Sequence, residues 1–164
     1  GGVSVRRGES GRRYPLASGA ELEVLWAPGR SEGSLADDRG MVVKLHWNGW
    51  RILMTGDAGF ETEKRLLDRG ADLDSDVWVM GRHAADHTGT MAFLRAVGPR
   101  VIVASEAQFP GAERIPDWWA RMVREEEVDL WNQGTTGAVA LQAGEGTLEL
   151  RSFLQKDRVL LLRK

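Results

Sequence analysis

The stretch from Met41 to Trp131 alternates short apolar strand patterns with amphipathic helix patterns, and this succession constrains the fold more than any other feature. It opens with a hairpin, because Asn48-Gly49 supplies the positive φ angles that a two-residue turn requires. The expected strands are 41–47, 50–54, 77–80, 101–104 and 128–131, and the expected helices are 60–67, 91–97 and 116–127. The pattern predicts an α/β layered domain with helices on one face of a sheet.

The two flanks of this region differ in character. Residues 1–19 are expected to form a flexible basic lead-in, and residues 20–164 are expected to form one domain that ends in three short strands. A solvated tail and a phosphate-binding arm are both compatible with the lead-in. Its basic residues are Arg6, Arg7, Arg12 and Arg13.

Composition excludes several classes of protein. The chain has no Cys, which rules out a disulfide scaffold, a thiolate zinc site and a cysteine nucleophile. Its formal net charge of −2 is not that of a general nucleic-acid binder. No apolar run is long enough to span a bilayer. Because the chain begins with Gly1-Gly2, we expect it to be a piece of a longer protein.

Asp57 is the first candidate for chemistry, because it closes an expected buried strand just before an expected helix. A carboxylate in this place commonly acts as a helix N-cap. It is also a good ligand for Zn²⁺ or Mn²⁺, and chemistry in α/β sheets gathers at such strand ends.

A second candidate lies between Gly81 and Thr90, directly after the strand expected at 77–80. His83, Asp86 and His87 occur there within five residues, and His-carboxylate clusters are typical of metal sites. The alternative is a loop with solvated imidazoles in which Asp86 or Thr88 caps the next helix. His46 is expected to be a surface strand residue.

Four segments together resemble the metallo-β-lactamase-like domain at the C-terminal end of ComEC-type competence proteins, over roughly residues 20–145. In that family a strand ends in Thr-Gly-Asp, the next strand ends in His-His-Gly-Ser, and a Phe-Leu helix and a further strand follow. The matching segments here are Arg51–Asp57, Glu61–Leu67, Ala71–Trp78 and Phe93–Val101.

The resemblance implies the C-terminal half of an αββα sandwich plus terminal β-strands, and it places Asp57 on the family's metal-bridging carboxylate. The His-His-Gly-Ser positions fall on residues 82–85, where Arg82 replaces the first His and His83 keeps the second. Residues 82–89 also approach the other superfamily signature, H-x-H-x-D-H-x-G, with Asp86 and His87 in register. We reject that register because the strand with Thr-Gly-Asp precedes the segment at the spacing of the later motif.

The resulting hypothesis is a degenerate binding or structural module of a DNA-uptake membrane protein, on one side or the other of a bacterial inner membrane. Arg82 and the basic lead-in would contact a DNA backbone, because a guanidinium repels a metal ion and binds phosphate. The alternative is a metal-dependent phosphodiesterase or nuclease that uses Zn or Mn held by Asp57, His83, Asp86 and His87. The sequence assigns no catalytic residue and leaves metal binding and enzymatic activity open.

Overall fold

The computed structural model describes residues 8–29, 40–81, 88–106 and 114–164. Ten strands and four helices, together with one short 3-10 turn at Ala17–Gly19, make up these residues. The helices are α1 (Phe60–Asp68), α2 (Met91–Val97), α3 (Asp117–Glu125) and α4 (Gln133–Thr136). The strands are β1 (Arg13–Pro15), β2 (Glu21–Trp26), β3 (Val42–Trp47), β4 (Trp50–Gly56), β5 (Val77–Met80), β6 (Val101–Ala104), β7 (Asp129–Asn132), β8 (Val139–Gly144), β9 (Thr147–Ser152) and β10 (Val159–Arg163).

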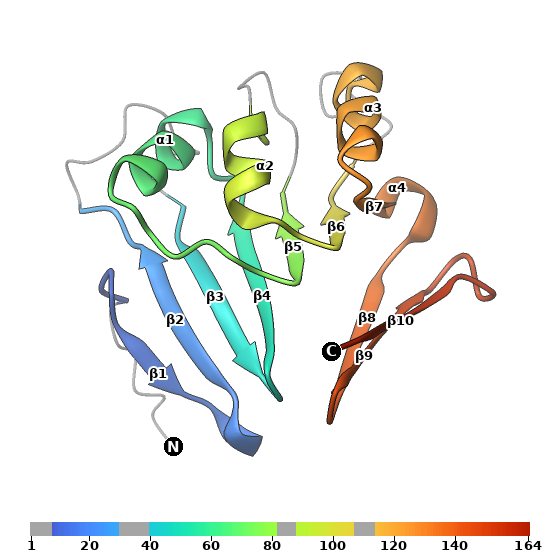
Figure 1. Cartoon of the computed structure of the whole chain (residues 1–164), viewed down its shortest axis with the longest axis horizontal. Helices are drawn as coiled ribbons and strands as arrows, with labels where there is room; N and C mark the ends of the chain where they lie inside the picture. Colours follow the sequence, from blue (N-terminus) through green and yellow to red (C-terminus); the bar gives the residue numbers. More distant parts are fainter. Residues whose placement is uncertain (1–7, 30–39, 82–87, 107–113) are drawn as a thin grey trace, which may run out of the picture.

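The main sheet has seven strands in the order β1-β2-β3-β4-β5-β6-β7, so neighbours in the sheet are also consecutive in the chain. Strands β1 to β4 are antiparallel, and β4 to β7 are parallel. Helices α1, α2 and α3 provide the three crossovers between the parallel strands, as such connections require. Figure 1 shows these helices side by side, apart from the three-stranded sheet that β8, β9 and β10 form.

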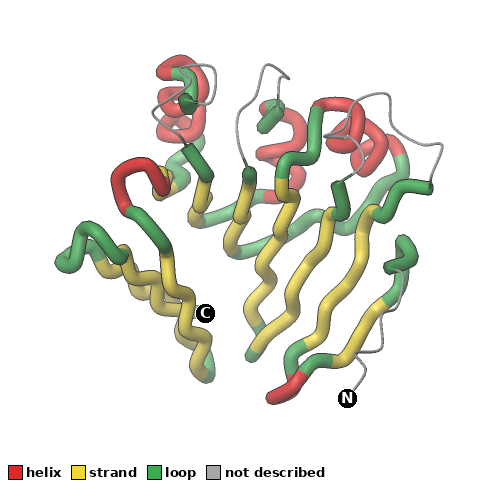
Figure 2. Tube along the Cα trace, turned by 180° about the vertical axis from the view of Figure 1, so that it is seen from behind, coloured by secondary structure: helices red, strands yellow, loops and turns green. Residues whose placement is uncertain are grey.

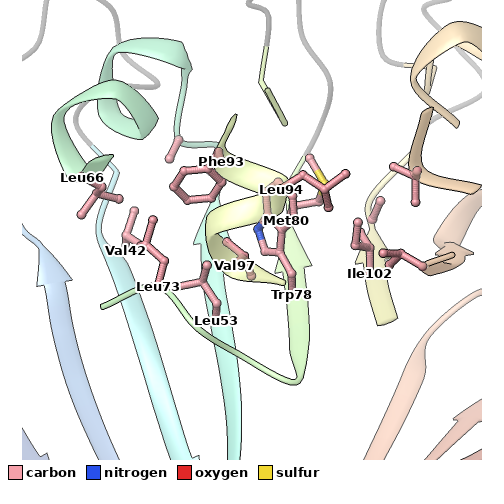
Figure 3. Close-up of a cluster of buried hydrophobic side chains, with 14 of the residues drawn as sticks. Val42, Leu53, Leu66, Leu73, Trp78, Met80, Phe93, Leu94, Val97 and Ile102 are labelled. Atoms are coloured by element: carbon pink, nitrogen blue, oxygen red, sulfur yellow. The ribbon is translucent and has the colours of Figure 1, made fainter. Parts of the chain in front are cut away.

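One face of the main sheet packs against the helices. Trp78 and Phe93 meet there with ring centroids 5.3 Å apart, a tilted aromatic pair. Figure 3 shows this cluster, in which α1 contributes Leu66 and α2 contributes Phe93, Leu94 and Val97. The prediction of a sheet with helices on one face is confirmed.

The opposite face of the main sheet packs against the three-stranded sheet. Trp50 and Trp131 of the main sheet are buried there with Leu148, Leu150 and Leu162 of the smaller one. Figure 2 shows the two sheets from behind. Polar contacts also join the two sheets, namely Lys164 with Asp76, Arg158 with Asp129, Asn48 with the carbonyl of Ala143, and Arg100 with the carbonyl of Arg163.

The hairpin prediction is confirmed in detail. Asn48 and Gly49 have φ angles of 50° and 79°, and Trp47 lies directly opposite Trp50. The sheet begins earlier in the chain than the sequence patterns indicate, because Arg13–Pro15 pairs with Glu21–Glu23 as β1. Helix α4 was also not expected, because the chain after Trp131 reads as strands alone.

Candidate functional site

The parallel strands β4, β5, β6 and β7 end on the same side of the main sheet, and we call this side the carboxyl edge. The residues that follow these strands are Asp57, Gly81, Ser105 and Gln133. Ligand chemistry in α/β sheets gathers at such an edge, because loops from several strands meet there. Asp57 and Gly81 were identified from the sequence, whereas Ser105, Glu106 and Asn132 were not. The sequence signal that identified Asp57, a polar residue at the end of a buried strand, was also available for these three residues.

The carboxylate of Asp57 lies directly against the α-carbon of Gly81. A Cβ atom added at Gly81 would come within 2.0 Å of Oδ1 of Asp57 and within 2.6 Å of the carbonyl group of Gly56. The backbone N–H of Gly81 donates a 2.7 Å hydrogen bond to that same carbonyl. Only glycine fits between these groups, so the absence of a side chain at position 81 allows the carboxylate to approach the neighbouring strand.

Asp57 does not occupy the N-cap position of α1, which corrects the interpretation of this residue as the N-cap. The N-cap residue is Gly59, which has no side chain to make a capping hydrogen bond. The helix begins at Phe60, as predicted, after a turn with φ of 55° at Gly56 and a 3.2 Å bond from the N–H of Ala58 to the carbonyl of Thr55. The Asp57 carboxylate lies beside Gly81, the residue that follows β5.

Glu63 is a buried carboxylate that the sequence analysis missed. Its side chain on α1 is 3% exposed and accepts hydrogen bonds from the N–H of Gly89 at 2.6 Å and from the N–H and hydroxyl of Thr90 at 3.0 Å. The indole N–H of Trp119 donates to the carbonyl of Gly89 at 2.8 Å. Helices α1 and α3 therefore hold both backbone groups of one glycine.

Glu63 gave no signal in the sequence, because a glutamate in a charged helix pattern is normally solvated. Thr90 caps α2 by accepting from the N–H of Phe93 at 3.3 Å. This corrects the alternative in which Thr88 caps that helix. Gly81 is held by its contact with Gly56 and Asp57, and Gly89 is held by Glu63 and Trp119. The described backbone is therefore fixed on both sides of residues 82–87.

A second polar group lies at the ends of β6 and β7. The carboxylate of Glu106 accepts hydrogen bonds from the N–H of Ile115 at 3.0 Å and from the side-chain amide of Asn132. Ser105 donates to the side-chain carbonyl of Gln133 at 2.8 Å. Glu106 and Asn132 line an open groove of about 870 Å³ beside α3, together with Arg114 and Arg124. Because acidic and basic side chains both line the groove, its charge does not favour an anionic ligand over a cationic one.

Most of the predicted site residues lie outside the described residues. These are Arg82, His83, Asp86 and His87, together with Arg6 and Arg7 of the basic lead-in. Among the residues that the structure describes, no three His, Asp or Glu side chains form a group that could hold a metal ion. His46, expected on the surface, is part-buried on β3, with its Nε2 atom 2.8 Å from Oε2 of Glu23.

Two arginines predicted to bind phosphate already contact carboxylates. Arg12 lies 2.9 Å from Glu9. Arg13 bonds Glu21 at 3.2 Å and Glu23 at 3.1 Å. These side chains are 64% and 53% exposed, so a phosphate can reach them but has to compete with the carboxylates.

The fold defines a layered α/β domain in which polar side chains gather at the carboxyl edge. No family model matches the sequence. The chain is similar to the Competence protein ComA of Neisseria gonorrhoeae, with 29% identity over 119 residues. The alignment covers 71% of this chain and 17% of that protein, so the chain corresponds to a small part of its relative's length. This similarity relates the chain to competence proteins. None of the helices in the described residues is long and apolar enough to cross a membrane.

Proposed function

We propose that this chain is a DNA-contacting domain of a larger membrane protein of bacterial DNA uptake, with a metallo-β-lactamase-like fold that has become a binding or structural module. The observation that carries the proposal is the similarity to a competence protein over most of the chain. A mixed sheet between a helical layer and a second sheet is compatible with half of an αββα sandwich. Residues 20–164, together with β1 of the lead-in, would form this partial domain beside the membrane.

Arg82 is the residue we assign to the DNA backbone. It follows Gly81 at the carboxyl edge, where the backbone on both sides of residues 82–87 is held by buried contacts. A guanidinium binds phosphate through two parallel hydrogen bonds. Arg6, Arg7, Arg12 and Arg13 would add backbone contacts that carry no sequence information.

The test is DNA binding by the full chain, measured by fluorescence anisotropy with single- and double-stranded oligonucleotides at a fixed low salt concentration. Arg82→Glu is expected to weaken binding by about tenfold or more, because it replaces a phosphate contact with a repulsion. The matched control is Arg121→Glu, an equal charge change at an exposed position of α3. Absence of binding by the unmodified chain, or equal losses in both variants, would contradict the role of Arg82.

A metal-dependent phosphodiesterase is the second candidate, and the contact between Asp57 and Gly81 favours it. That contact brings a carboxylate oxygen next to the residue directly before the segment with His83, Asp86 and His87. Carboxylate and imidazole donors suit Zn²⁺ or Mn²⁺, which would activate a water for phosphodiester hydrolysis.

Elemental analysis after purification without chelator tests this second candidate. Near-stoichiometric Zn or Mn that is lost in Asp57→Ala, and retained in the control Asp68→Ala at the exposed end of α1, would support the enzyme and justify a nuclease assay. No metal after addition of excess Zn²⁺ or Mn²⁺ would remove it.

A further inference from the structure

The two sheets of the described residues have β1, β7, β8 and β10 as their outer strands. An outer strand presents unpaired backbone N–H and C=O groups, and folded proteins usually protect such an edge with Pro, a bulge, a charge or a covering group. Strand β1 has three residues and ends in Pro15. Side chains already bond the carbonyls of Leu130 on β7 and Ala143 on β8, at 3.1 and 3.0 Å. These three edges are therefore protected at least in part.

Strand β10 is the least protected of the outer strands. It pairs with β9 along its whole length without a bulge, and its sequence Val159–Arg163 contains neither Pro nor Gly. Val159 and Leu161 are 43% and 46% exposed, and no other strand of the described residues carries a large apolar side chain that is exposed. An apolar edge of this kind is a site for pairing with a further strand.

The hydrogen bonds between β9 and β10 show which residues of β10 face β9. The N–H of Ser152 donates to the carbonyl of Arg158, and the N–H of Lys164 donates to the carbonyl of Gly146. Because the ladder of an antiparallel pair alternates along the strand, the even-numbered residues of β10 bond β9. The backbone groups of the odd-numbered residues therefore point to the free edge.

The odd-numbered residues of β10 are Val159, Leu161 and Arg163. The carbonyl of Arg163 accepts a 2.9 Å hydrogen bond from the side chain of Arg100, which covers the end of the edge. The N–H and carbonyl groups of Val159 and Leu161 bond no other group of the described residues. A partner strand would therefore find its hydrogen bonds at these two residues.

We propose that β10 pairs antiparallel with β10 of a second copy of this chain, about a two-fold axis at Leu160. In this register Val159 lies opposite Leu161 of the partner subunit, and the two residues exchange their N–H and C=O groups. The axis creates this pair twice, which satisfies the backbone groups of both residues in both copies. The two small sheets become one, in the order β8-β9-β10-β10-β9-β8.

The side chains of β10 match those of a second copy in this register. On the outer face, Val159 packs against Leu161 of the partner subunit, so both apolar side chains leave water. On the inner face, Leu160 meets Leu160 of the partner subunit and extends the core between the sheets. Arg163 comes level with Asp157 of the partner subunit, which precedes its β10. Both charged side chains are exposed, and neither makes an ion pair within the described residues.

Pairing through β10 stops at a dimer, because each copy has one β10 edge and the two-fold axis uses both. Opposite charges and apolar side chains meet across an edge that is related to itself by symmetry. The inference does not depend on the proposed contact with DNA, which is assigned to Arg82 and to the arginines of the lead-in.

The experiment is sedimentation velocity of the full chain over a range of concentrations. The wild type is expected to show a reversible equilibrium between monomer and dimer. Leu161→Pro is expected to weaken dimerisation by about a hundredfold, because Pro removes an N–H that the dimer needs and the pairing with β9 does not. The control Phe153→Ser removes a nearby exposed apolar side chain outside the register and is expected to dimerise like the wild type.

Charge reversal tests the register. Arg163→Asp and Asp157→Arg each place like charges opposite each other at both ends of the paired strands, and each is expected to weaken dimerisation by about tenfold. The double variant exchanges the charges and is expected to recover most of the wild-type affinity. The control Arg121→Asp makes the same charge change at an exposed position on α3 and is expected to have no effect.

A wild type that stays monomeric at the highest attainable concentration overturns the proposal. So does a dimer that Leu161→Pro leaves intact, or a double charge variant that dimerises no better than the single ones, because the dimer would then use another surface or another register. Near-UV circular dichroism verifies that each variant is folded. The charge variants test the proposal even where Leu161→Pro does not fold.

Discussion

The two ends of the parallel strands are held by different interactions. At the carboxyl edge, Glu63 and Glu106 accept hydrogen bonds from backbone N–H groups of the chain that follows the strands. At the opposite end, the amino edge, side chains of opposite charge pair with each other, as Asp76 does with Arg51 and Lys164.

The interactions at the two edges therefore hold different parts of the molecule. At the amino edge, the ion pair of Lys164 with Asp76 attaches the end of the three-stranded sheet to the main sheet, and buried Lys44 bonds the backbone carbonyls of Asp72 and Asp74 before β5. At the carboxyl edge, Glu63 fixes the chain at Gly89 and Thr90, after residues 82–87, where the sequence concentrates its candidates for chemistry, and Glu106 fixes the chain at Ile115. We therefore expect substitutions at the carboxyl edge to cost more stability than the loss of an ion pair at the amino edge.

The largest effect is expected from Gly81→Ala at the carboxyl edge. The new Cβ would overlap the carbonyl group of Gly56 and the carboxylate of Asp57, and we expect a loss of about 3 kcal/mol in the free energy of unfolding. Adding Asp57→Ala should restore only part of the loss, because the overlap with backbone remains. Urea denaturation followed by tryptophan fluorescence measures both.

Gly11→Ala is the control for that substitution. Gly11 has a φ angle of 82° with no atom near its Cβ position, so the variant tests backbone strain alone and should lose about 1 kcal/mol. A loss at Gly81 no larger than this would show that Asp57 and Gly56 can move away easily. The contact would then not hold the carboxyl edge in place.

A smaller effect is expected from Glu63→Gln. The side-chain amide can accept fewer of the bonds from Gly89 and Thr90, and we expect a loss of about 2 kcal/mol that does not change with salt, because the group is buried. Denaturation at low and high salt is the measurement. Glu61→Gln, an exposed position on the same helix, should change stability by less than about 0.5 kcal/mol.

Asp76→Asn should have a smaller effect that does depend on salt. The amide oxygen can still accept from the N–H of Arg51, while the attraction to Lys164 is lost, so we expect about 1 kcal/mol. The difference from wild type should shrink in high salt, because Lys164 is 39% exposed. The same salt response at Glu63 and at Asp76 would remove the distinction between the two edges.

The smallest effect concerns the exposed pair of Arg95 and Glu126, which lie 2.8 Å apart. The hydrogen bond from Arg95 lowers the pKa of the Glu126 carboxyl below its ordinary value. The pair therefore stabilises the fold above that ordinary value, and its contribution is lost as the pH falls through the lowered pKa. Titration of Glu126 by NMR in the wild type and in Arg95→Gln should show the pKa return toward normal; an unchanged pKa would contradict the pairing.

Local patterns were sufficient to predict the main elements. The Asn48-Gly49 hairpin and helices α1 to α3 follow from turn chemistry and helical periodicity, which need only neighbouring residues. Strand β1 was missed because Arg13–Pro15 is too short to show alternation and is stabilised by pairing with β2. Adjacent Trp118 and Trp119 show the effect of helical periodicity, since neighbouring side chains on a helix lie about 100° apart and these two are 55% and 0% exposed.

The candidate site was less predictable because its contacts join distant segments. Asp57 was correctly located at a strand end, but its contact with Gly81 spans a helix and a strand, and no local rule distinguishes it from a cap. Glu63 shows the same limit, since its partners Gly89 and Thr90 lie on the far side of β5 in the chain. Contacts between residues so far apart in the chain can be identified only from the tertiary structure.

The sequential strand order of the main sheet gives the domain a direction of assembly. Each strand of the main sheet pairs with the strand made just before it, so no pairing within this sheet has to wait for a distant part of the chain. Strands can join the sheet one after another as the chain leaves the ribosome, starting from β1 and β2. The three-stranded sheet, made last, then closes over Trp50 and Trp131 and completes the second layer of the core.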